Sequence, residues 1–325
     1  MRARAVWIEA TGGPEVLQLI DADLPPPGPG EVRMRNTAIG LNFIDAYHRS
    51  GLYPVELPAP IGVEAAGVVE AVGEGVSDFA PGDRVATFGP QRGAYATARN
   101  VAASALIKLP DDIPDETAAA ALLKGCTTEF LVERCGRVEP GWPVLVHAAA
   151  GGVGLLLVQW LKAVGATVIG TTGNAEKAAL ATAAGADHVL PAGEPDLAAR
   201  VRQLTGGEGV RVTFDGVGKA TFETSLDSTA RRGLVISFGN ASGAVGPVDF
   251  AILARKGSLF AARPTLFDYY VTPEERRAGA SRLFDMLRSG KLEVTVGQRY
   301  ALEDVRRAHE DLEARRTTGS TLLLP

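Results

Sequence analysis

The sequence predicts an α/β protein in which a β-rich first domain is followed by a doubly wound domain. Extended patterns separated by Gly and Pro fill roughly the first 125 residues. From Cys126 onward, short apolar runs alternate with stretches long enough for crossover helices, a rhythm typical of a parallel sheet covered by helices. The 325-residue chain also exceeds the about 250–300 residues at which a single core stops growing, so two domains are expected.

The first domain is predicted over residues 1–125. Its strand-like segments include EVRMRNTAIGLN at 31–42, GVEAAGVVEAVG at 62–73 and PGDRVATF at 81–88, and PPPGPG at 25–30 is a turn-rich connection. Each segment is short and bounded by turn residues, which favours a β-rich domain.

The second domain is predicted over residues 126–262. Five apolar runs are predicted as strands: 144–149, 167–172, 188–190, 210–216 and 233–239. The intervening stretches have the length of right-handed crossover helices: 152–163, 174–184 and 196–204. After SLFAAR at 258–263 come predicted helices at Pro273–Arg288 and Glu303–Ala314 and a final strand, so residues 263–325 are expected to complete the first domain.

Composition excludes several classes of protein. The net charge of −5 provides no basic field for nucleic acid. The two cysteines, Cys126 and Cys135, are too few for a disulfide scaffold and fit a reducing compartment. Glu9 interrupts the apolar run near the start, and no run approaches about 18 apolar residues. We therefore expect a soluble cytoplasmic protein without a membrane segment or a nucleic-acid partner.

A dinucleotide fingerprint follows the first strand of the second domain. The strand VLVHAA leads into Ala149-x-Gly151-x-x-Gly154 and then into an apolar helical stretch. Small residues let the backbone approach a pyrophosphate, with Gly152 and Val153 at the helix start, where free N–H groups bind anions. The alternative is a glycine-rich turn without a ligand. The surrounding strands and helices favour a dinucleotide.

The end of the next strand indicates which nicotinamide cofactor is preferred. An NAD enzyme usually has an acid about 20 residues after the fingerprint, whereas residues 170–174 read Gly-Thr-Thr-Gly-Asn. Asn174 is a candidate N-cap, and Lys177 falls in the first helical turn, where the helix dipole disfavours a cation. A bound 2′-phosphate explains Lys177, although a solvated surface lysine is the alternative. NADPH is therefore favoured over NADH.

The chain resembles the medium-chain dehydrogenase/reductase family, specifically its zinc-free quinone oxidoreductases related to zeta-crystallin. The resemblance extends over essentially the whole length. It is carried by AIGLNFIDAYHRSGLYP at 38–54, GVEAAGVVEAVGEGV at 62–76, GDRVA at 82–86, LLKGCTTEFLV at 122–132, VHAAAGGVG at 146–154, FDGVG at 214–218, RRGLVISFGNASGAV at 231–245 and the terminal TGSTLLLP. It implies a GroES-like catalytic domain followed by a Rossmann cofactor domain.

Zinc-dependent relatives carry catalytic Cys and His ligands that this chain lacks. Asn42, Val63 and Leu123 occupy the corresponding places, and the first 125 residues contain no cysteine. Zinc needs thiolate, imidazole or carboxylate ligands. We therefore predict no metal.

The resemblance also implies the positions of the site residues. Asn42, Tyr47 and Tyr53 are expected at the nicotinamide end, with Lys124 and Thr128 on the opposite wall. Amide or phenol donors there can stabilise the oxyanion left by hydride transfer to a quinone. Without the resemblance, the two tyrosines read as packing residues and Asn42 as a buried hydrogen-bonded side chain.

Cofactor contacts are implied along both halves of the second domain and near the C-terminus. Gly173, Lys177 and Arg315 are expected around the adenosine phosphate; the rest of the cofactor is expected to contact Val217, Phe238, Gly239, Asn240, Ser242 and Arg263. Phe238 and Val217 also fit an ordinary core. Ala192 replaces a tyrosine of the family near the adenosine, which weakens the preference for NADPH. Glu64 and His147 are interpreted as structural, His147 as a hydrogen-bonded core residue.

The expected function is NADPH-dependent reduction of quinones in the cleft between the domains, without a metal. One alternative is reduction of activated alkenes such as enones or alkenals. Another is a non-enzymatic NADPH-binding role of the crystallin or RNA-binding type, against which the acidic charge argues. The resemblance implies a homodimer, formed by edge-to-edge pairing of GLVISFGN at 233–240.

Overall fold

The computed structural model describes residues 1–325, and their contacts divide the chain into two compact units. Unit 1 comprises Met1–Lys124, Tyr270–Phe284 and Val294–Pro325, and unit 2 comprises Gly125–Tyr269 and Asp285–Glu293. The chain therefore leaves unit 1 at Gly125 for the whole of the parallel sheet, returns at Tyr270, and leaves it a second time for Asp285–Glu293.

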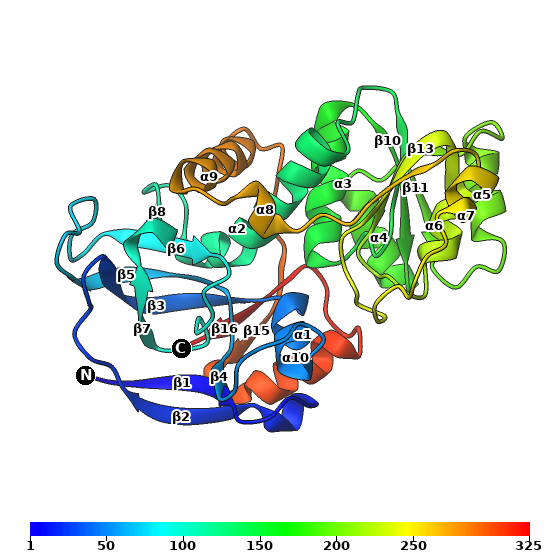
Figure 1. Cartoon of the computed structure of the whole chain (residues 1–325). Helices are drawn as coiled ribbons and strands as arrows, with labels where there is room; N and C mark the ends of the chain where they lie inside the picture. Colours follow the sequence, from blue (N-terminus) through cyan, green and yellow to red (C-terminus); the bar gives the residue numbers. More distant parts are fainter. The chain divides into compact units, whose positions relative to one another are not determined.

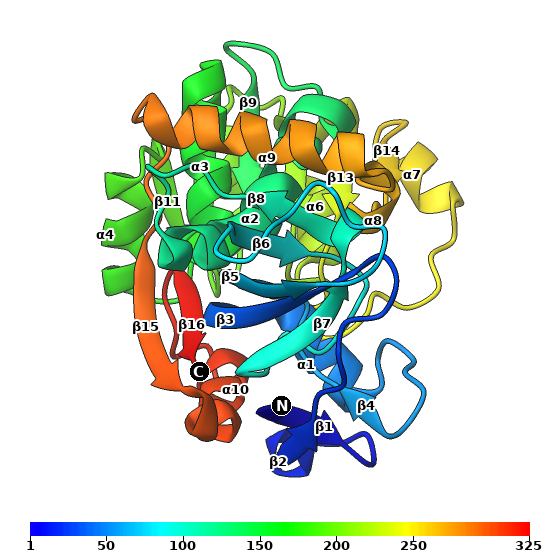
Figure 2. The same ribbon diagram turned by 90° about the vertical axis from the view of Figure 1, so that its left-hand side faces the viewer.

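Unit 1 is built on a mainly antiparallel sheet with strands from both ends of the chain (Figure 2). The order is β15-β16-β3-β5-β6-β8, and β7 also pairs with β3. The strands are β3 (Glu31–Leu41), β5 (Glu64–Val72), β6 (Arg84–Phe88), β7 (Ala98–Ala102), β8 (Leu106–Lys108), β15 (Val296–Ala301) and β16 (Ser320–Leu324). A three-stranded sheet, β2-β1-β4, lies beside it, with β1 at Arg2–Ile8, β2 at Gln18–Asp23 and β4 at Ala59–Pro60.

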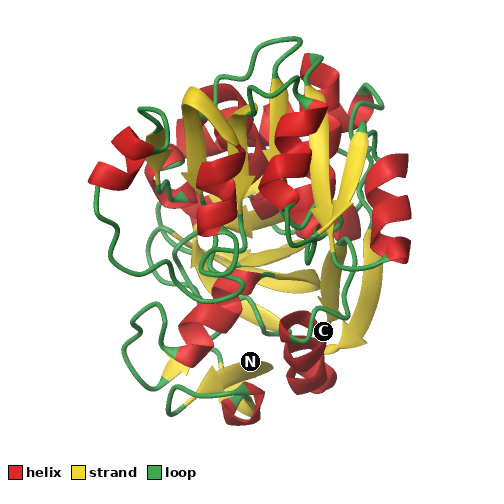
Figure 3. Ribbon diagram, turned by 90° about the vertical axis from the view of Figure 1, so that its right-hand side faces the viewer, coloured by secondary structure: helices red, strands yellow, loops and turns green.

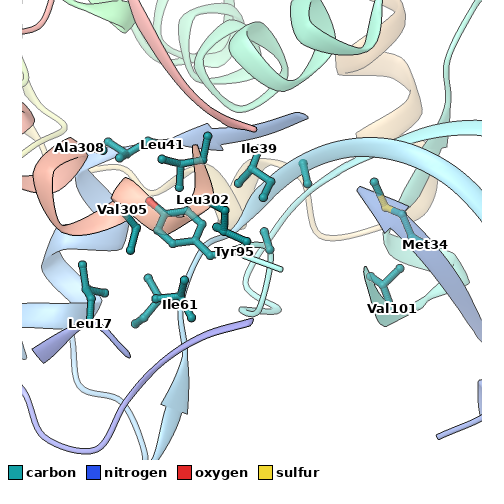
Figure 4. Close-up of a cluster of buried hydrophobic side chains, with 14 of the residues drawn as sticks. Leu17, Met34, Ile39, Leu41, Ile61, Tyr95, Val101, Leu302, Val305 and Ala308 are labelled. Carbon is teal, nitrogen blue, oxygen red and sulfur yellow. The ribbon is translucent and has the colours of Figure 1, made fainter. Parts of the chain in front are cut away.

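Four helices contribute to unit 1: α1 (Phe43–Ser50), the first ten residues of α2 (Asp115–Glu129), most of α9 (Pro273–Arg288) and α10 (Val305–Glu313). Single 3-10 turns lie at Pro14–Val16, Ala103–Ala105 and Leu302–Asp304. Helix α10 buries Val305, Ala308, His309 and Leu312, the i, i+3, i+4, i+7 face of an amphipathic helix. Figure 4 shows Val305 and Ala308 of this face near Tyr95 in the main core of unit 1.

Unit 2 is a six-stranded parallel sheet with helices on both faces (Figures 1 and 3). The order is β11-β10-β9-β12-β13-β14, which is the doubly wound order of dinucleotide-binding folds. The strands are β9 (Pro143–Val146), β10 (Thr167–Thr172), β11 (His188–Pro191), β12 (Val210–Asp215), β13 (Thr229–Ser237) and β14 (Phe260–Ala262). The predicted α/β class with a doubly wound second domain is confirmed.

The helices of unit 2 follow the predicted alternation: α3 (Gly152–Val164), α4 (Ala175–Ala183), α5 (Leu197–Leu204) and α6 (Phe222–Ser228), with the shorter α7 (Ala251–Arg255) and α8 (Leu266–Tyr269). A π-helical turn, Phe130–Cys135, continues α2. Two elements, β10 and α9, have the predicted bounds. Strand β9 ends at Val146, three residues earlier than predicted, because residues 147–150 already form the turn into α3.

The prediction that GLVISFGN lies at a sheet edge is wrong. Its strand, β13, pairs with β12 on one side and with β14 on the other, so both of its edges are already occupied. The edge strand next to it is β14, whose three residues were not predicted as a strand. Any pairing with another chain at this end of the sheet must therefore involve β14.

The structure contains no helix with enough consecutive apolar residues to span a bilayer.

Candidate functional site

The turn after β9 and the first residues of α3 pack together too closely for a side chain at Gly154. Ala148 has a φ of 53°, and a Cβ on Gly154 would lie 2.2 Å from the Ala148 carbonyl oxygen. Helix α3 begins at Gly152 after the N-cap Gly151, and no side chain caps it. A 13-residue helix that starts from a glycine turn without a side-chain cap presents its positive end to an anion. This geometry fits the pyrophosphate of a dinucleotide.

The end of the neighbouring strand β10 has free space around Gly173, just before α4. The predicted N-cap is confirmed, because the side-chain oxygen of Asn174 accepts the backbone N–H of Lys177 at 2.8 Å. Lys177 is the third residue of α4, and a Cβ at Gly173 would meet nothing within 4 Å. The structure therefore brings Gly173 and Lys177 together at the carboxyl end of the sheet, where a doubly wound fold binds its ligand.

The loops that follow β12 and β13 are tied together by Ser242. The hydroxyl of Ser242 donates to the carbonyl of Val217 at 2.8 Å and accepts the N–H of Ala220 at 2.9 Å. The Phe238 ring comes within 3.0 Å of a Cβ placed on Gly216, so Gly216 leaves room for it. Val217, Phe238 and Ser242, all predicted cofactor contacts, thus lie in one pair of linked loops.

The remaining predicted residues of this half also lie together. In the amide orientation that satisfies its neighbours, Asn240 accepts from Arg263 Nη2 at 3.0 Å and donates to the Gly239 carbonyl at 3.1 Å. Gly239 itself approaches Gly216 so closely that a Cβ would lie 2.3 Å from the Gly216 oxygen. Asn240 and Arg263 are therefore hydrogen-bonded to each other next to Gly239, a position where a side chain does not fit.

A buried polar network supports these loops from beneath. Asp215, at the end of β12, accepts the N–H groups of Val217 and Gly218, each at 2.9 Å, and the hydroxyl of Ser225 at 2.7 Å. The same hydroxyl lies 3.1 Å from His147 Nε2. Asp215 and Ser225 were not predicted, because the only signal in the sequence was the acid at the end of a strand.

His147 completes this network and is a core residue, as predicted. It is 3% exposed, and its Nδ1 lies 3.2 Å from the Thr171 hydroxyl. Burial lowers the pKa of His147, and the negative charge of Asp215 opposes that shift. A neutral imidazole therefore links the ends of β9, β10 and β12.

In unit 1, two predicted polar side chains and one backbone N–H converge on one carboxylate. Glu64 Oε2 accepts from Asn42 Nδ2 at 2.9 Å and from Lys124 Nζ at 3.4 Å, while Oε1 accepts the backbone N–H of Leu123 at 2.6 Å. Glu64 is 1% exposed, Lys124 5% and Asn42 6%. The structure thus assembles a buried amide–carboxylate–ammonium cluster from β5, α2 and the residue that precedes α1.

A second buried network holds the backbone of Asn42. Asp45 Oδ2 accepts the Asn42 backbone N–H and the Tyr95 hydroxyl, each at 2.9 Å. Tyr95 lies 3.2 Å from His309 Nε2, and Arg49 Nη1 lies 3.3 Å from His309 Nδ1. Because a guanidinium can only donate, His309 Nδ1 must accept, so the proton of a neutral His309 sits on Nε2 and points to Tyr95.

Burial has opposite effects on the two ionisable ends of this network. Desolvation raises the pKa of Asp45 to about 7, against the lowering effect of the Asn42 N–H and the Tyr95 hydroxyl. Desolvation and the nearby Arg49 charge lower the pKa of His309 to about 3. The positive charge of Arg49 is itself balanced by Glu313, whose two oxygens accept from it at 2.9 and 2.6 Å.

The two predicted tyrosines lie together, Tyr47 on α1 and Tyr53 just after it. Their ring centroids are 5.2 Å apart in an edge-on arrangement, and the Tyr53 N–H donates to the Tyr47 carbonyl at 3.0 Å. Both side chains are partly exposed. They pack against each other and still reach solvent, so packing and a binding role are compatible.

The positions that correspond to zinc ligands hold apolar side chains or an amide. Val63 is fully buried and Leu123 is 8% exposed. The described chain contains no group of three or more His, Cys, Asp or Glu side chains arranged to hold a metal ion. Two predicted residues remain. Thr128 is buried on α2, one turn beyond Lys124 and in unit 2, and Arg315 is an exposed residue of unit 1 after α10.

Comparisons with known proteins agree with both units. Residues 28–111 match the family described as alcohol dehydrogenase GroES-like domain, and residues 152–271 match the family described as zinc-binding dehydrogenase. The chain is 50% identical to a quinone oxidoreductase of Pseudomonas aeruginosa, covering 99% of this chain and 100% of that protein.

Two further relatives extend the comparison. The crystal structure of Escherichia coli quinone oxidoreductase complexed with NADPH has a TM-score of 0.97 and 47% identity, covering 99% of this chain and 100% of that one. A 2-haloacrylate reductase of a Burkholderia species is 43% identical over 99% of this chain and 98% of its own length. The chain belongs to the medium-chain dehydrogenase/reductase family, among its quinone oxidoreductases.

Proposed function

We propose that the protein is an NADPH-dependent quinone oxidoreductase that works without a metal. The observation that carries the proposal is that one chain has both features: a glycine-rich start of α3 without a side-chain cap, in unit 2, and the buried Asn42–Glu64–Lys124 cluster, in unit 1. The first suits a dinucleotide and the second suits an anionic substrate oxygen. Relatives named quinone oxidoreductase, one of them solved with NADPH, support both halves of the proposal.

The residues of unit 2 fit the cofactor. Gly151, Gly152, Val153 and Gly154 would hold the pyrophosphate at the start of α3, after Ala149. Gly173 and Lys177 would take the adenosine phosphate, with Arg315 of unit 1 as a further cation. Val217, Phe238, Gly239, Asn240, Ser242 and Arg263 would border the rest. When bound, NADPH supplies a hydride, so that a quinone becomes a hydroquinone anion and one proton completes the product.

Four residues of unit 1 and Thr128 of unit 2 would provide the reacting environment. Asn42, Tyr47, Tyr53, Lys124 and Thr128 are the proposed catalytic residues, with a tyrosine or water as the source of the proton. We also propose that 1–125, completed by 263–325, forms the catalytic domain and 126–262 the cofactor domain. The cytoplasm is the proposed location.

Steady-state oxidation of NADPH tests this function. Benzoquinone, naphthoquinone and phenanthrenequinone should support turnover, and enones, alkenals and a 2-haloacrylate should support much less. Turnover confined to the alkenes would show that activated alkenes, and not quinones, are the substrate class. The similarity to a 2-haloacrylate reductase would agree with that result. Tight NADPH binding without any turnover would favour a binding role.

We propose that the protein is a homodimer joined through β14. This edge strand exposes Phe260, whose relative exposure is 63%. Antiparallel pairing of β14 with a second copy would remove both free edges and cover that aromatic ring.

A further inference from the structure

The Asn42–Glu64–Lys124 cluster gives different tasks to the two proposed catalytic residues, an inference that rests on the proposed quinone reductase activity. A side-chain amide has two N–H donors. Asn42 Nδ2 directs them at Glu64 Oε2 (2.9 Å) and at the Gly40 carbonyl (3.4 Å). An Asn42 held in this way can offer an N–H to a substrate oxygen only by giving up its contact with Glu64 or with the Gly40 carbonyl.

The ammonium of Lys124 differs from the Asn42 amide in charge. It lies 3.4 Å from Glu64 Oε2, so the carboxylate helps to fix its position. A positive charge that is 5% exposed stabilises a developing anion more than a neutral amide does, because water screens it little. Charge therefore favours Lys124 as the group that contacts the anionic oxygen.

Glu64 is fixed from several sides. Its Oε1 accepts the Leu123 N–H at 2.6 Å, which anchors the carboxylate to the residue next to Lys124. Gly40 pairs with Glu64 across β3 and β5, and a Cβ on Gly40 would lie 2.3 Å from Glu64 Oε2 and 2.3 Å from the Ala119 carbonyl. The strand therefore has a glycine where the carboxylate needs space, and Glu64 has little freedom to move away.

The backbone of Asn42 is fixed independently by Asp45, which accepts its N–H at 2.9 Å. Asn42 is thus held by one carboxylate at its backbone and by another at its side chain. Rotation of the amide to present an N–H elsewhere would leave the buried Glu64 carboxylate without that donor, which is costly at 1% exposure.

We propose that Glu64 is a positioning residue that keeps Asn42 as its hydrogen-bond donor and thereby makes Lys124 the residue that contacts the anionic oxygen of the reduced quinone. In this arrangement the hydride reduces one end of the quinone, the electron pair moves to the other oxygen, and that phenolate oxygen lies against the Lys124 ammonium until it is protonated. Glu64 touches neither substrate nor cofactor and acts only through Lys124 and Asn42.

The first experiment compares kcat and KM for a benzoquinone. Lys124→Met should lower kcat about 100-fold or more, the usual cost of losing one anion-stabilising donor. Asn42→Ala should lower kcat less than about 10-fold, and Glu64→Gln about 10-fold to 100-fold because the ammonium is misplaced. KM for NADPH should stay within about 3-fold of wild type in all three. Equal losses for Asn42→Ala and Lys124→Met would overturn the proposal.

Two variants separate positioning from folding. Glu64→Asp keeps the charge and should recover part of the kcat that Glu64→Gln loses. Asp115→Asn is the matched control, because Asp115 is a half-buried carboxylate of unit 1, ion-paired with Arg84 at 2.5 Å and outside the cluster. It should lower the melting temperature and leave kcat unchanged. An equal fall in kcat for Asp115→Asn and Glu64→Gln would indicate a merely structural role for Glu64.

A second experiment needs no turnover. 4-Nitrophenolate, a phenolate probe for the reduced product, is titrated into the protein with NADP⁺ and followed by its visible absorbance. Lys124→Met should weaken binding about 10-fold, the value of one charge-assisted hydrogen bond, Glu64→Gln should weaken it to a similar extent, and Asn42→Ala less than about 3-fold. No quinone turnover by wild type, with this order of binding intact, would reject the proposed function and retain the inference. Turnover with no loss for Lys124→Met and Glu64→Gln would reject the inference alone.

Discussion

At the scale of single residues, Gly154 is where a single added methyl group would have the largest predicted effect on cofactor binding. A Cβ there would lie 2.2 Å from the Ala148 carbonyl oxygen and 2.8 Å from the Ala149 carbonyl carbon. Gly154→Ala should therefore displace the start of α3 and weaken NADPH binding at least about 10-fold, measured by fluorescence titration. Gly246→Ala is the control, because a Cβ at Gly246 meets nothing within 4 Å. Unchanged NADPH affinity in Gly154→Ala would contradict the pyrophosphate site.

Lys177 tests which dinucleotide the protein prefers. Its N–H caps α4 through Asn174, so replacing only the side chain leaves the cap in place. Lys177→Ala should raise KM for NADPH about 10-fold and change KM for NADH little, because a charge-assisted contact to phosphate is lost only with NADPH. Steady-state kinetics with both cofactors provides the measurement. Equal loss for both would leave Lys177 as a surface lysine.

Single residues also differ in how far the sequence could predict their place in the site. The fingerprint and the N-cap were predictable because each lies within one short segment, Ala149–Gly154 or Asn174–Lys177. The Glu64 cluster was not, because its partners come from residues 42 and 124, brought together only by the folded sheet and α2. The capping pair Asn42 and Asp45, three residues apart, was the one local signal that was missed.

At the scale of elements, the alternation of apolar runs and crossover stretches predicted unit 2 because parallel strands, buried on both faces, are nearly continuous apolar runs. It failed for β14, because three residues, Phe260–Ala262, carry too short a pattern. Strand order also requires long-range pairing. For that reason β13 was assigned to the edge although β14 covers it.

Helix α10 makes a pH-dependent contribution to stability through His309. The folded-state pKa of about 3 lies below the ordinary 6.5, so the unfolded chain binds a proton first as the pH falls. The stability that His309 contributes is therefore complete above about pH 6.5 and is lost progressively towards pH 3. Asp45 acts in the opposite sense, since its raised pKa of about 7 favours folding below about pH 4 and loses that contribution towards pH 7.

Comparing variants isolates the histidine. From pH 6.5 to 4.5, the urea midpoint of His309→Gln should rise relative to that of wild type. Asp45 favours folding in both proteins as the pH falls, whereas protonation of His309 in the unfolded chain destabilises wild type alone. Urea midpoints at pH 7.5, 6.5, 5.5 and 4.5 measure the difference. His188→Gln, at an exposed histidine of β11, should follow wild type. A His309→Gln curve parallel to wild type would show that His309 is not buried as a neutral imidazole.

At the scale of the whole molecule, each unit has one feature that folding alone does not require: a buried ion pair in unit 1 and an exposed aromatic ring on an edge strand in unit 2. Unit 1 buries the Glu64 carboxylate and the Lys124 ammonium in a cluster instead of apolar side chains, although ion pairs rarely improve stability over apolar packing. Unit 2 has a three-residue edge strand with an exposed aromatic ring. The proposed chemistry would explain the first feature, and the proposed pairing of two copies would explain the second.

The edge strand leads to a prediction for the assembled protein. If two copies pair through β14, Phe260→Asp should place two like charges near the twofold axis and remove them from water. Charged side chains on edge strands prevent pairing in this way. Light scattering at about 10 µM should give twice the 33.9 kDa chain mass for wild type and a single chain mass for Phe260→Asp. Ile20→Asp, at a comparably apolar exposed position on β2 of unit 1, should stay dimeric. A dimer that survives Phe260→Asp would show that the copies meet elsewhere, since a buried aspartate pair at β14 would not be tolerated.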